Sequence, residues 1–313
     1  MTSDGHPLIL LVGPTAVGKT EVAVGVAELL DGEIVSADSR LFYRGMDIGT
    51  AKPGPLERAS VPHHLIDIVN PDETLSLAVF QSMARAAIEE IRRRGKLPLL
   101  VGGTGQYVRA VTDGWQPPEV HPNPRLRNEL SVMAQERGGA WLHERLQGLD
   151  PEAAGGIDPR NVRRTIRALE VILTTGRTFS GQRGRSDTPD HLVRAGLRRP
   201  REALYARIDE RIEAMFAMGL LEEVRGLLEK GYSPDLPAMS AIGYRECVHV
   251  ISGAWTVEQA KAAMRRATRT YVRRQSGWFK ESDPNIRWFE ADNPGVVSAV
   301  AAYARAAIHD PRV

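Results

Sequence analysis

The amino-acid sequence predicts an α/β protein in which a parallel sheet is flanked by helices and carries a helical insertion. Three observations lead to this fold class. Short apolar strand patterns alternate with helical patterns over the first hundred residues, a glycine-rich motif joins the first strand to the first helix, and the pattern becomes helical beyond residue 118. Such alternation is typical of parallel sheets, because each parallel strand needs a crossover connection.

The predicted strands are short apolar runs, and helical patterns lie between them. The strands are LILLV (8–12), EIVSA (33–37), LPLLV (97–101), LVRAGLR (192–198) and a late strand in IRWFE (286–290). The helices span 19–30, 75–94, 201–230 and 256–280, and the second of them stops at Gly95. The carboxyl ends of such strands are where an α/β sheet binds its ligands.

A proline-rich segment separates the first strands from the helical insertion. WQPPEVHPNPR (115–125) contains four prolines, which is typical of a linker or hinge. From Pro124 to Thr175 the pattern is that of short helices. We therefore predict a core made of residues 1–117 and 198–313, with residues 118–197 as an insertion domain.

Composition excludes several classes of protein. A hydrophobic content of 42% and a net charge of +2 are ordinary for a soluble protein, although 35 of the 41 basic residues are arginine, which a GC-rich genome would also explain. The single cysteine, Cys247, excludes a disulfide framework. With no signal-peptide or membrane-span pattern, we expect a cytoplasmic protein without membrane contact, and we expect a monomer.

The motif GPTAVGKT matches the phosphate-binding pattern GxxxxGK[ST], so the core is expected to be P-loop NTPase-like. Its glycines allow successive N–H groups to face one anion, Lys19 adds a positive charge, and the Thr20 hydroxyl is placed to bind Mg²⁺. Alone, the motif suggests ATP or another nucleotide. The predicted phosphate ligands are Gly13, Pro14, Thr15, Ala16, Val17, Gly18, Lys19 and Thr20.

Two further strand ends carry candidate residues. A hydrolysing P-loop protein normally has an Asp after an apolar strand, yet LPLLV leads into GGTG (102–105) without an acid. Asp38 follows EIVSA instead, where it could support a metal, act as a general base or cap the next segment. Thr104 offers a hydroxyl to a phosphate or substrate, although a simple turn explains GGTG equally well.

The chain resembles the tRNA dimethylallyltransferases, in their bacterial form, over nearly its whole length. The departure is Gln106, which stands where the family more often has Leu in GGTGLY, and we expect it to change local packing only. The motifs that carry the resemblance are GPTAVGKT, SADSRLFYRGMDIGTAKP (36–53), PHHLID (62–67), LLVGGTGQYV (99–108), RALEV (167–171), ARIDERIEAMFAMGLLEEV (206–224) and IGYRE (242–246).

The resemblance implies transfer of a dimethylallyl group from dimethylallyl diphosphate to N6 of adenine 37, in tRNAs that read codons beginning with U. It assigns Asp38 as the general base and Arg211 as a clamp on the departing diphosphate. Thr20 and Mg²⁺ would stabilise that leaving group, and Thr104 would contact both donor and tRNA. Without the resemblance, the pattern favours a solvated or ion-paired role for Arg211 beside an apolar helix stripe.

The resemblance also implies contacts with the tRNA anticodon stem-loop. They are Asp38, Ser39, Arg40, Leu41, Thr104, Arg127, Arg163, Arg164, Arg167, Gly243, Tyr244 and Arg245. Arg266, Arg269 and Arg273 are spaced to share a helix face, which would be a second basic surface or only a solvated one. Tyr43, Tyr244 and Trp278 are possible stacking partners for the adenine, with core packing as the alternative.

Three other functions remain open on the residues alone. A small-molecule or nucleotide kinase would use ATP at GPTAVGKT, and a related prenyltransferase would use free AMP or ADP as its acceptor. A GTP-switched RNA-binding protein is the non-enzymatic alternative, but the chain contains no guanine-reading NKxD motif. The arginine-bearing insertion and the C-terminal helices favour tRNA over a free nucleotide.

Overall fold

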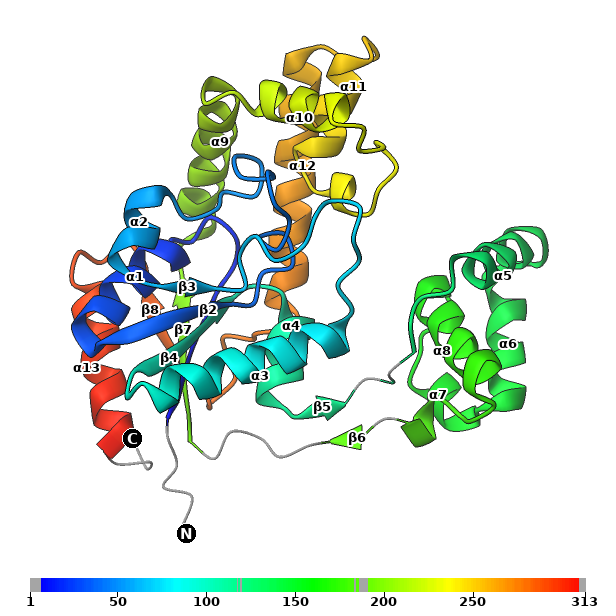
Figure 1. Ribbon diagram of the computed structural model, residues 1–313, viewed down its shortest axis with the longest axis horizontal. Coiled ribbons are helices and arrows are strands. Elements are labelled where there is room, and N and C mark those ends of the chain that lie inside the picture. Colours follow the sequence, from blue (N-terminus) through cyan, green and yellow to red (C-terminus); the bar gives the residue numbers. More distant parts are fainter. Residues whose placement is uncertain (1–6, 117, 119, 183, 186–190, 310–313) are drawn as a thin grey trace. The chain divides into compact units, whose positions relative to one another are not determined.

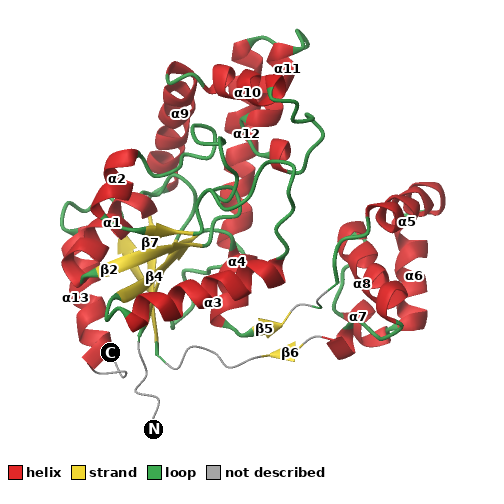
Figure 2. Cartoon of the chain, viewed as in Figure 1, coloured by secondary structure: helices red, strands yellow, loops and turns green. Residues whose placement is uncertain are grey.

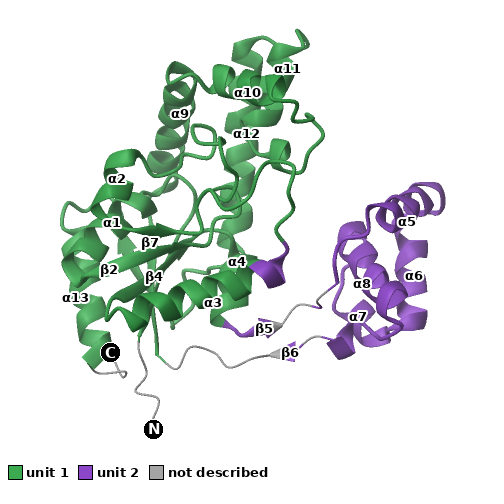
Figure 3. Cartoon of the chain, viewed as in Figure 1, with its two compact units in different colours: residues 1–75, 80–112, 189–313 green, residues 76–79, 113–188 purple. Residues whose placement is uncertain are grey.

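The computed structural model of the chain describes residues 7–116, 118, 120–182, 184–185 and 191–309 (Figure 1). The chain forms two compact units (Figure 3). Unit 1 comprises residues 1–75, 80–112 and 189–313, and unit 2 comprises residues 76–79 and 113–188. Among the described helices, none is both long and apolar enough to cross a bilayer.

Unit 1 is built on a parallel sheet, which is yellow in Figure 2. Its six strands follow the order β3-β2-β4-β1-β7-β8. β1 pairs with both β4 and β7, so that Leu10 lies opposite Leu100 and Arg194. The predicted α/β class with a parallel sheet is therefore confirmed. The strands are β1 (Leu8–Val12), β2 (Gly32–Ser36), β3 (His63–His64), β4 (Leu97–Gly102), β7 (Leu192–Arg198) and β8 (Arg287–Glu290).

The strand order explains why the candidate residues gather at one edge. β1 and β2 both pair in parallel with β4, so the segments that follow Val12, Ser36 and Gly102 leave the sheet side by side. β1 and β2 are buried at every residue, as expected for strands covered on both faces. The sheet thus brings GPTAVGKT, Asp38 and GGTG to its carboxyl edge.

Helices cover the sheet and extend beyond its carboxyl edge (Figure 1). They are α1 (Lys19–Leu30), α2 (Pro55–Ser60), α3 (Leu77–Arg93), α4 (Gly105–Thr112), α9 (Arg201–Ala217), α10 (Leu220–Glu229), α11 (Tyr244–Ile251), α12 (Val257–Ser276) and α13 (Val296–His309), with a short 3-10 helix at Ala238–Ser240. α12 packs against α9 and α11.

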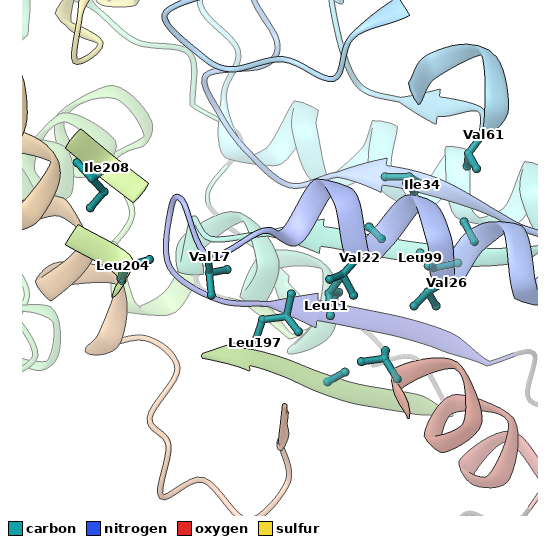
Figure 4. Close-up of a cluster of buried hydrophobic side chains, with 14 of the residues drawn as sticks. Leu11, Val17, Val22, Val26, Ile34, Val61, Leu99, Leu197, Leu204 and Ile208 are labelled. Atoms are coloured by element: carbon teal, nitrogen blue, oxygen red, sulfur yellow. The ribbon is translucent and has the colours of Figure 1, made fainter. Parts of the chain in front are cut away.

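The core of unit 1 anchors α1 to the sheet (Figure 4). Leu11, Ile34 and Leu99 belong to the same buried cluster as Val22 and Val26 of α1. Each such side chain contributes about 1.5–3 kcal/mol when it is fully buried. This packing fixes the start of α1, and with it the end of the phosphate-binding loop.

One predicted element of unit 1 is wrong. The helix expected over 201–230 is two helices, because Gly219 adopts a left-handed φ of 97° and ends the first of them. Glycine takes this conformation at little steric cost, so the break changes the direction of the chain. α10 therefore does not continue the line of α9.

Unit 2 is a helical unit with its own core. Its elements are β5 (Trp115–Gln116), α5 (Pro124–Arg137), α6 (Gly139–Leu149), α7 (Pro151–Gly155), α8 (Val162–Thr175), the 3-10 helix Ser180–Gln182 and β6 (Gly184–Arg185). Leu142, Leu146 and Leu169 form part of that core. The predicted helical insertion is present, but its boundary at 197 is too late, since β7 pairs with β1 in unit 1.

Candidate active site

The phosphate-binding loop joins β1 to α1 in a conformation that only small residues allow. A Cβ at Gly13 would lie 2.7 Å from the carbonyl oxygen of Leu197, and Gly18 has a φ of 108°. Gly18 is also the N-cap of α1 and brings no side chain to cap the helix. The first amides of this 12-residue helix are therefore available to an anion, as the motif predicts.

Lys19 lies inside this loop. Its Nζ donates hydrogen bonds to the carbonyl oxygens of Gly13 (3.0 Å) and Pro14 (2.8 Å). Burial lowers the pKa of the Lys19 ammonium to about 8, although the Asp38 carboxylate opposes the shift. An anion beside Lys19 would raise this pKa again, because opposite charges favour each other's ionised forms.

Asp38 follows β2 at the same edge of the sheet. Its Oδ1 accepts a hydrogen bond from the Arg40 N–H (3.0 Å). Asp38 therefore caps the segment that follows it, which is one of its predicted roles. Arg40 in turn donates to the carbonyl oxygen of Pro237 (3.2 Å). Asp38 therefore shapes its own loop while its carboxylate faces the site, and the two roles do not exclude each other.

Arg211 reaches the site from α9. Burial and the nearby charge of Arg207 lower the pKa of its guanidinium, whereas Asp38 raises it. Arg207, one turn earlier on α9, donates from Nε to the carbonyl oxygen of Ala16 in the loop (3.1 Å). The alternative interpretation of Arg211 as a solvated surface residue is therefore wrong. Arg211 is a mostly buried cation beside the loop and Asp38.

A cavity of about 440 Å³ begins at the phosphate-binding loop. Lys19, Thr20, Asp38 and Arg211 all line it. Its volume lies within the range of small-molecule sites, and it holds polar groups at the loop end. Four aliphatic side chains contribute to the wall, those of Ile34, Leu41, Ile66 and Val101. The charged residues Glu21, Glu57, Arg207 and Glu210 also line it.

A second cavity, of about 780 Å³, adjoins the first and also has Asp38 in its wall. It is lined by five arginines, Arg40, Arg211, Arg245, Arg266 and Arg274, together with Thr104 and apolar residues of α9 and α12. The two cavities share a small set of wall residues: Thr15, Ala16, Asp38, Thr50, Ala51 and Arg211. A ligand in each would therefore meet at Asp38 and Arg211.

The residues around Thr20 fit a magnesium ion that a substrate carries. Thr20 and Asp38 line one cavity and supply a hydroxyl and a carboxylate, which are ligands that Mg²⁺ accepts. Clusters of three or more His, Cys, Asp or Glu side chains suited to a metal do not occur in the described part of the chain. Mg²⁺ bound through substrate phosphates and water needs no such cluster.

Of the predicted tRNA contacts in unit 1, some line a cavity and others are buried in the core. Asp38, Ser39, Arg40, Thr104 and Arg245 line the second cavity, whereas Leu41 lines the first.

Tyr244 lies in the core. Its ring is fully buried, and its hydroxyl donates to Glu223 Oε1 (2.5 Å). For Tyr244 the core-packing alternative therefore holds in this structure, whereas its contact with tRNA stays a prediction. Gly243, beside it, is also buried.

Two other aromatic candidates remain partly exposed. Tyr43 and Trp278 are half-buried. Trp278 packs against Gly105, and the guanidinium of Arg109 lies 5.5 Å from the centre of its ring. Gln106, the departure from the family pattern, is exposed on α4.

The arginines of unit 2 also differ from one another. Arg127 Nε and Arg167 Nη1 donate to Glu170 at 2.8 and 2.7 Å, and Glu170 is fully buried. A buried carboxylate requires such partners, so these two arginines are structural within unit 2. Arg163 and Arg164, in contrast, are exposed on α8.

The predicted basic face of α12 is not a single surface. Arg266 lines the second cavity, but Arg269 donates to Asp209 of α9 (2.7 Å) and lies over the ring of Tyr205. Arg273 donates to the hydroxyl of Thr270. The expectation that all three face one partner is wrong for Arg269, whose charge is already paired.

Sequence reasoning missed three residues that organise the site. Gln275 bonds the phosphate-binding loop to GGTG, and Arg207 supports the loop at Ala16. Glu223 accepts from the backbone N–H groups of Asp47 and Ile48 at 2.9 and 2.8 Å. Long-range side chain to backbone bonds leave no local pattern. Arg207 and Glu223 lie within a family motif (206–224), whereas Gln275 lies in none of the motifs, so no signal in the sequence pointed to it.

Comparison with known proteins gives one consistent result. Residues 41–282 match the family model described as IPP transferase. A tRNA dimethylallyltransferase of Roseiflexus castenholzii is 55% identical over 299 residues, covering 96% of this chain and 97% of that protein. One of Chloroflexus aurantiacus is 52% identical over 287 residues, covering 92% of this chain and 97% of that protein.

Solved structures agree with these relatives. The full-length tRNA isopentenylpyrophosphate transferase of Bacillus halodurans has a TM-score of 0.73 at 40% identity, and the match covers 98% of each chain. A eukaryotic dimethylallyltransferase acting on tRNA has a TM-score of 0.76 at 25% identity, covering 96% of this chain and 77% of that one. The similarity therefore extends through both compact units.

Proposed function

The chain belongs to the IPP transferase family of tRNA dimethylallyltransferases, and from this premise we propose that it transfers the dimethylallyl group of dimethylallyl diphosphate to N6 of adenine 37. The observation that carries the proposal is the pair of cavities that share Asp38 and Arg211 in their walls. One cavity begins at a phosphate-binding loop and the other is lined by arginines. Donor and acceptor can thus approach one carboxylate from two sides.

The donor diphosphate is assigned to the loop cavity. Displacement at its allylic carbon breaks a C–O bond, and the departing diphosphate takes the electron pair. The amides at the start of α1, the Lys19 ammonium and the Arg211 guanidinium would stabilise this charge. Mg²⁺, when held by the diphosphate and the Thr20 hydroxyl, supplies further neutralisation of the leaving group.

Asp38 is assigned as the general base. The exocyclic amine of adenine is a weak nucleophile, because its lone pair is delocalised into the ring. It must lose a proton as the new N–C bond forms, and a carboxylate within hydrogen-bond reach is suited to take it. Asp38 lies where the two cavities share their walls, which supports this role.

The acceptor is assigned to the larger cavity. Adenine 37 lies in a single-stranded loop, from which a base is unstacked at low cost. Arg40, Arg245, Arg266 and Arg274 would meet the phosphates around that base, and Thr104 would contact both substrates. The family expectation is a run of adenines at 36–38, in tRNAs that read codons beginning with U.

Every residue assigned to the reaction lies in one chain, so a monomer suffices. The residues assigned to the donor and those assigned to the RNA in the arginine-lined cavity all belong to this chain, and no second polypeptide is needed. We place the reaction in the cytoplasm, where tRNA is modified. No residue of the assigned set requires oxidising conditions.

A label-transfer assay tests the proposal against its rivals. The protein is incubated with labelled dimethylallyl diphosphate, Mg²⁺ and one of three acceptors: tRNA, AMP or ADP. Label is expected in tRNA and not in the free nucleotides. A parallel incubation with ATP and no prenyl donor measures nucleotide consumption, and ATP turnover without prenyl transfer would support a kinase instead.

A further inference from the structure

We propose that Gln275 is a positioning residue, which holds the phosphate-binding loop in the conformation that receives the donor diphosphate. The proposal deepens the function proposed above and rests on it for the identity of the donor. Gln275 lies on α12, 260 positions from Thr15 in the sequence, and does not itself line the loop cavity. It therefore acts through the loop rather than by contact with the reacting atoms.

The side chain of Gln275 bridges two backbone segments. The Thr15 N–H donates to Oε1 (2.8 Å), and Nε2 donates to the carbonyl oxygen of Gly103 (3.0 Å). The two partners fix the orientation of the amide, since an N–H needs the oxygen and a carbonyl needs the nitrogen. Gln275 is only 4% exposed, so water does not compete freely for these bonds.

No other side chain of this length offers the same pair of bonds. A glutamate accepts only, a lysine donates only and a methionine does neither. Loss of the amide would leave a buried N–H and a buried carbonyl without partners, which costs more than the bonds themselves contribute. The chemistry of the bridge therefore specifies glutamine.

The surroundings of Gln275 are built for the bridge. A Cβ at Gly103 would collide with Gln275 Nε2 and would lie 2.9 Å from the carbonyl oxygen of Gly13. The close approach of the two loops thus requires a glycine at 103. One turn before Gln275, the hydroxyl of Tyr271 lies 3.4 Å from the Thr104 hydroxyl, so α12 contacts the GGTG segment twice.

The bridge determines where the loop amides point. The Thr15 N–H is committed to Gln275, and Lys19 holds the carbonyl oxygens of Gly13 and Pro14. Arg207 holds the carbonyl oxygen of Ala16. With these groups fixed, the remaining amides up to the start of α1 are preorganised for the diphosphate, and preorganisation improves affinity because less ordering is needed on binding.

The test compares wild type with Gln275→Met, which keeps the length of the side chain and removes both hydrogen bonds. Calorimetry measures the Kd of dimethylallyl diphosphate and of inorganic diphosphate, each with Mg²⁺, and filter binding measures the Kd of an anticodon stem-loop RNA. Ser276→Ala, at an exposed neighbour, is the matched control. Hydrogen exchange of the peptide that contains the loop reports its order directly.

Gln275→Met is expected to weaken both diphosphate ligands roughly tenfold and to speed exchange in the loop, with the RNA Kd changed less than twofold. Ser276→Ala is expected to match wild type. If the Met variant does not fold, Gln275→Asn provides the same comparison, because its side chain is too short to reach both loops. Diphosphate affinity within twofold of wild type, or equal losses for diphosphate and RNA, would overturn the proposal.

This outcome is separate from that of the proposed function. The diphosphate measurements need no turnover, so they test Gln275 even if no prenyl group reaches RNA. Conversely, prenyl transfer by wild type together with an unchanged diphosphate Kd in the Met variant would leave the function intact and remove only the positioning role.

Discussion

Asp38, Lys19 and Arg211 form one electrostatic group at the carboxyl edge of the sheet. Asp38 counteracts the lowered pKa of both cations, while burial of each cation causes that lowering. Two partly buried cations beside one carboxylate give a local excess of positive charge at the loop, although Glu21, Glu57 and Glu210 also line the cavity. Such a site favours a polyanion, and a diphosphate satisfies it.

Replacement of Asp38 tests the assignment of the general base. Asp38→Asn keeps an oxygen that accepts from the Arg40 N–H, so the loop is preserved while the base is lost. We expect the single-turnover rate of prenyl transfer to fall about 10²–10⁴-fold, with the RNA Kd within about threefold. A variant that turns over at the wild-type rate would exclude Asp38 as the base.

The lowered pKa of Lys19 predicts a pH dependence of donor binding. Because the pKa of Lys19 is about 8, raising the pH from 7 to 9 deprotonates Lys19 in most molecules of the free protein. A bound diphosphate, in contrast, favours the charged form of Lys19. Affinity for dimethylallyl diphosphate should fall roughly tenfold across this interval, as measured by calorimetry. Lys19→Met should bind weakly and without this pH dependence; a flat wild-type profile would contradict the argument.

At the scale of elements, strands were the best predicted features. β1 and β7 occur where the apolar patterns placed them, and α1 has the predicted bounds. These elements follow from local periodicity and from a glycine-rich start. The division of α9 from α10 was missed, because Gly219 within a helical pattern signals a break only when its φ is positive.

The site was predicted less completely than the fold. Asp38 and the loop were identified because strand ends and a phosphate motif have local signatures. The burial of Tyr244 and the pairing of Arg127 and Arg167 with Glu170 depend on tertiary contacts, and no spacing rule reveals them. The family resemblance pointed to Tyr244, Arg127 and Arg167 as tRNA contacts, but it does not tell whether a side chain is exposed or is held in the core of its unit.

Glu223 shows how one element orders the segment next to the site. Its carboxylate accepts from three consecutive backbone N–H groups, those of residues 47, 48 and 49, and from the Tyr244 hydroxyl. This binding ties α10 and α11 to the segment that carries Thr50 and Ala51 into both cavities. Burial and the charge of Glu223 raise the pKa of Tyr244, so its hydroxyl stays a donor.

Glu223→Ala should therefore destabilise the fold. Removal of the acceptor leaves several partly buried donors unsatisfied, and we expect the free energy of unfolding in urea to fall by about 1–3 kcal/mol. Glu222→Ala, an exposed neighbour whose Arg225 partner is 3.9 Å away, should cost less than about 0.5 kcal/mol. Equal effects of the two substitutions would show that the backbone contacts contribute nothing.

At the scale of the whole molecule, basic residues are distributed over both units. Unit 1 carries arginines in its larger cavity, and unit 2 exposes Arg163 and Arg164 on α8. A chain of net charge +2 thus concentrates positive charge locally. We expect these local surfaces, and not the overall charge, to bind the phosphates of RNA.

Salt dependence of RNA binding tests this distribution. The logarithm of the affinity should fall linearly with the logarithm of the salt concentration, and Arg163→Ala and Arg164→Ala should each reduce the slope by roughly 0.7–1. Arg160→Ala serves as the control, because Asp158 already pairs with Arg160 at 2.8 Å. A wild-type slope near zero, or slopes unchanged in a double variant, would contradict a role for these arginines.

The most direct test of the central claim is to map the product on the RNA. An anticodon stem-loop with adenine at 37 is incubated with dimethylallyl diphosphate and Mg²⁺, and its fragments are sequenced by mass spectrometry. We expect one dimethylallyl group, on N6 of adenine 37, with release of diphosphate and no modification when guanine replaces that adenine. Prenylation of another position, or of free AMP in preference to the RNA, would contradict it.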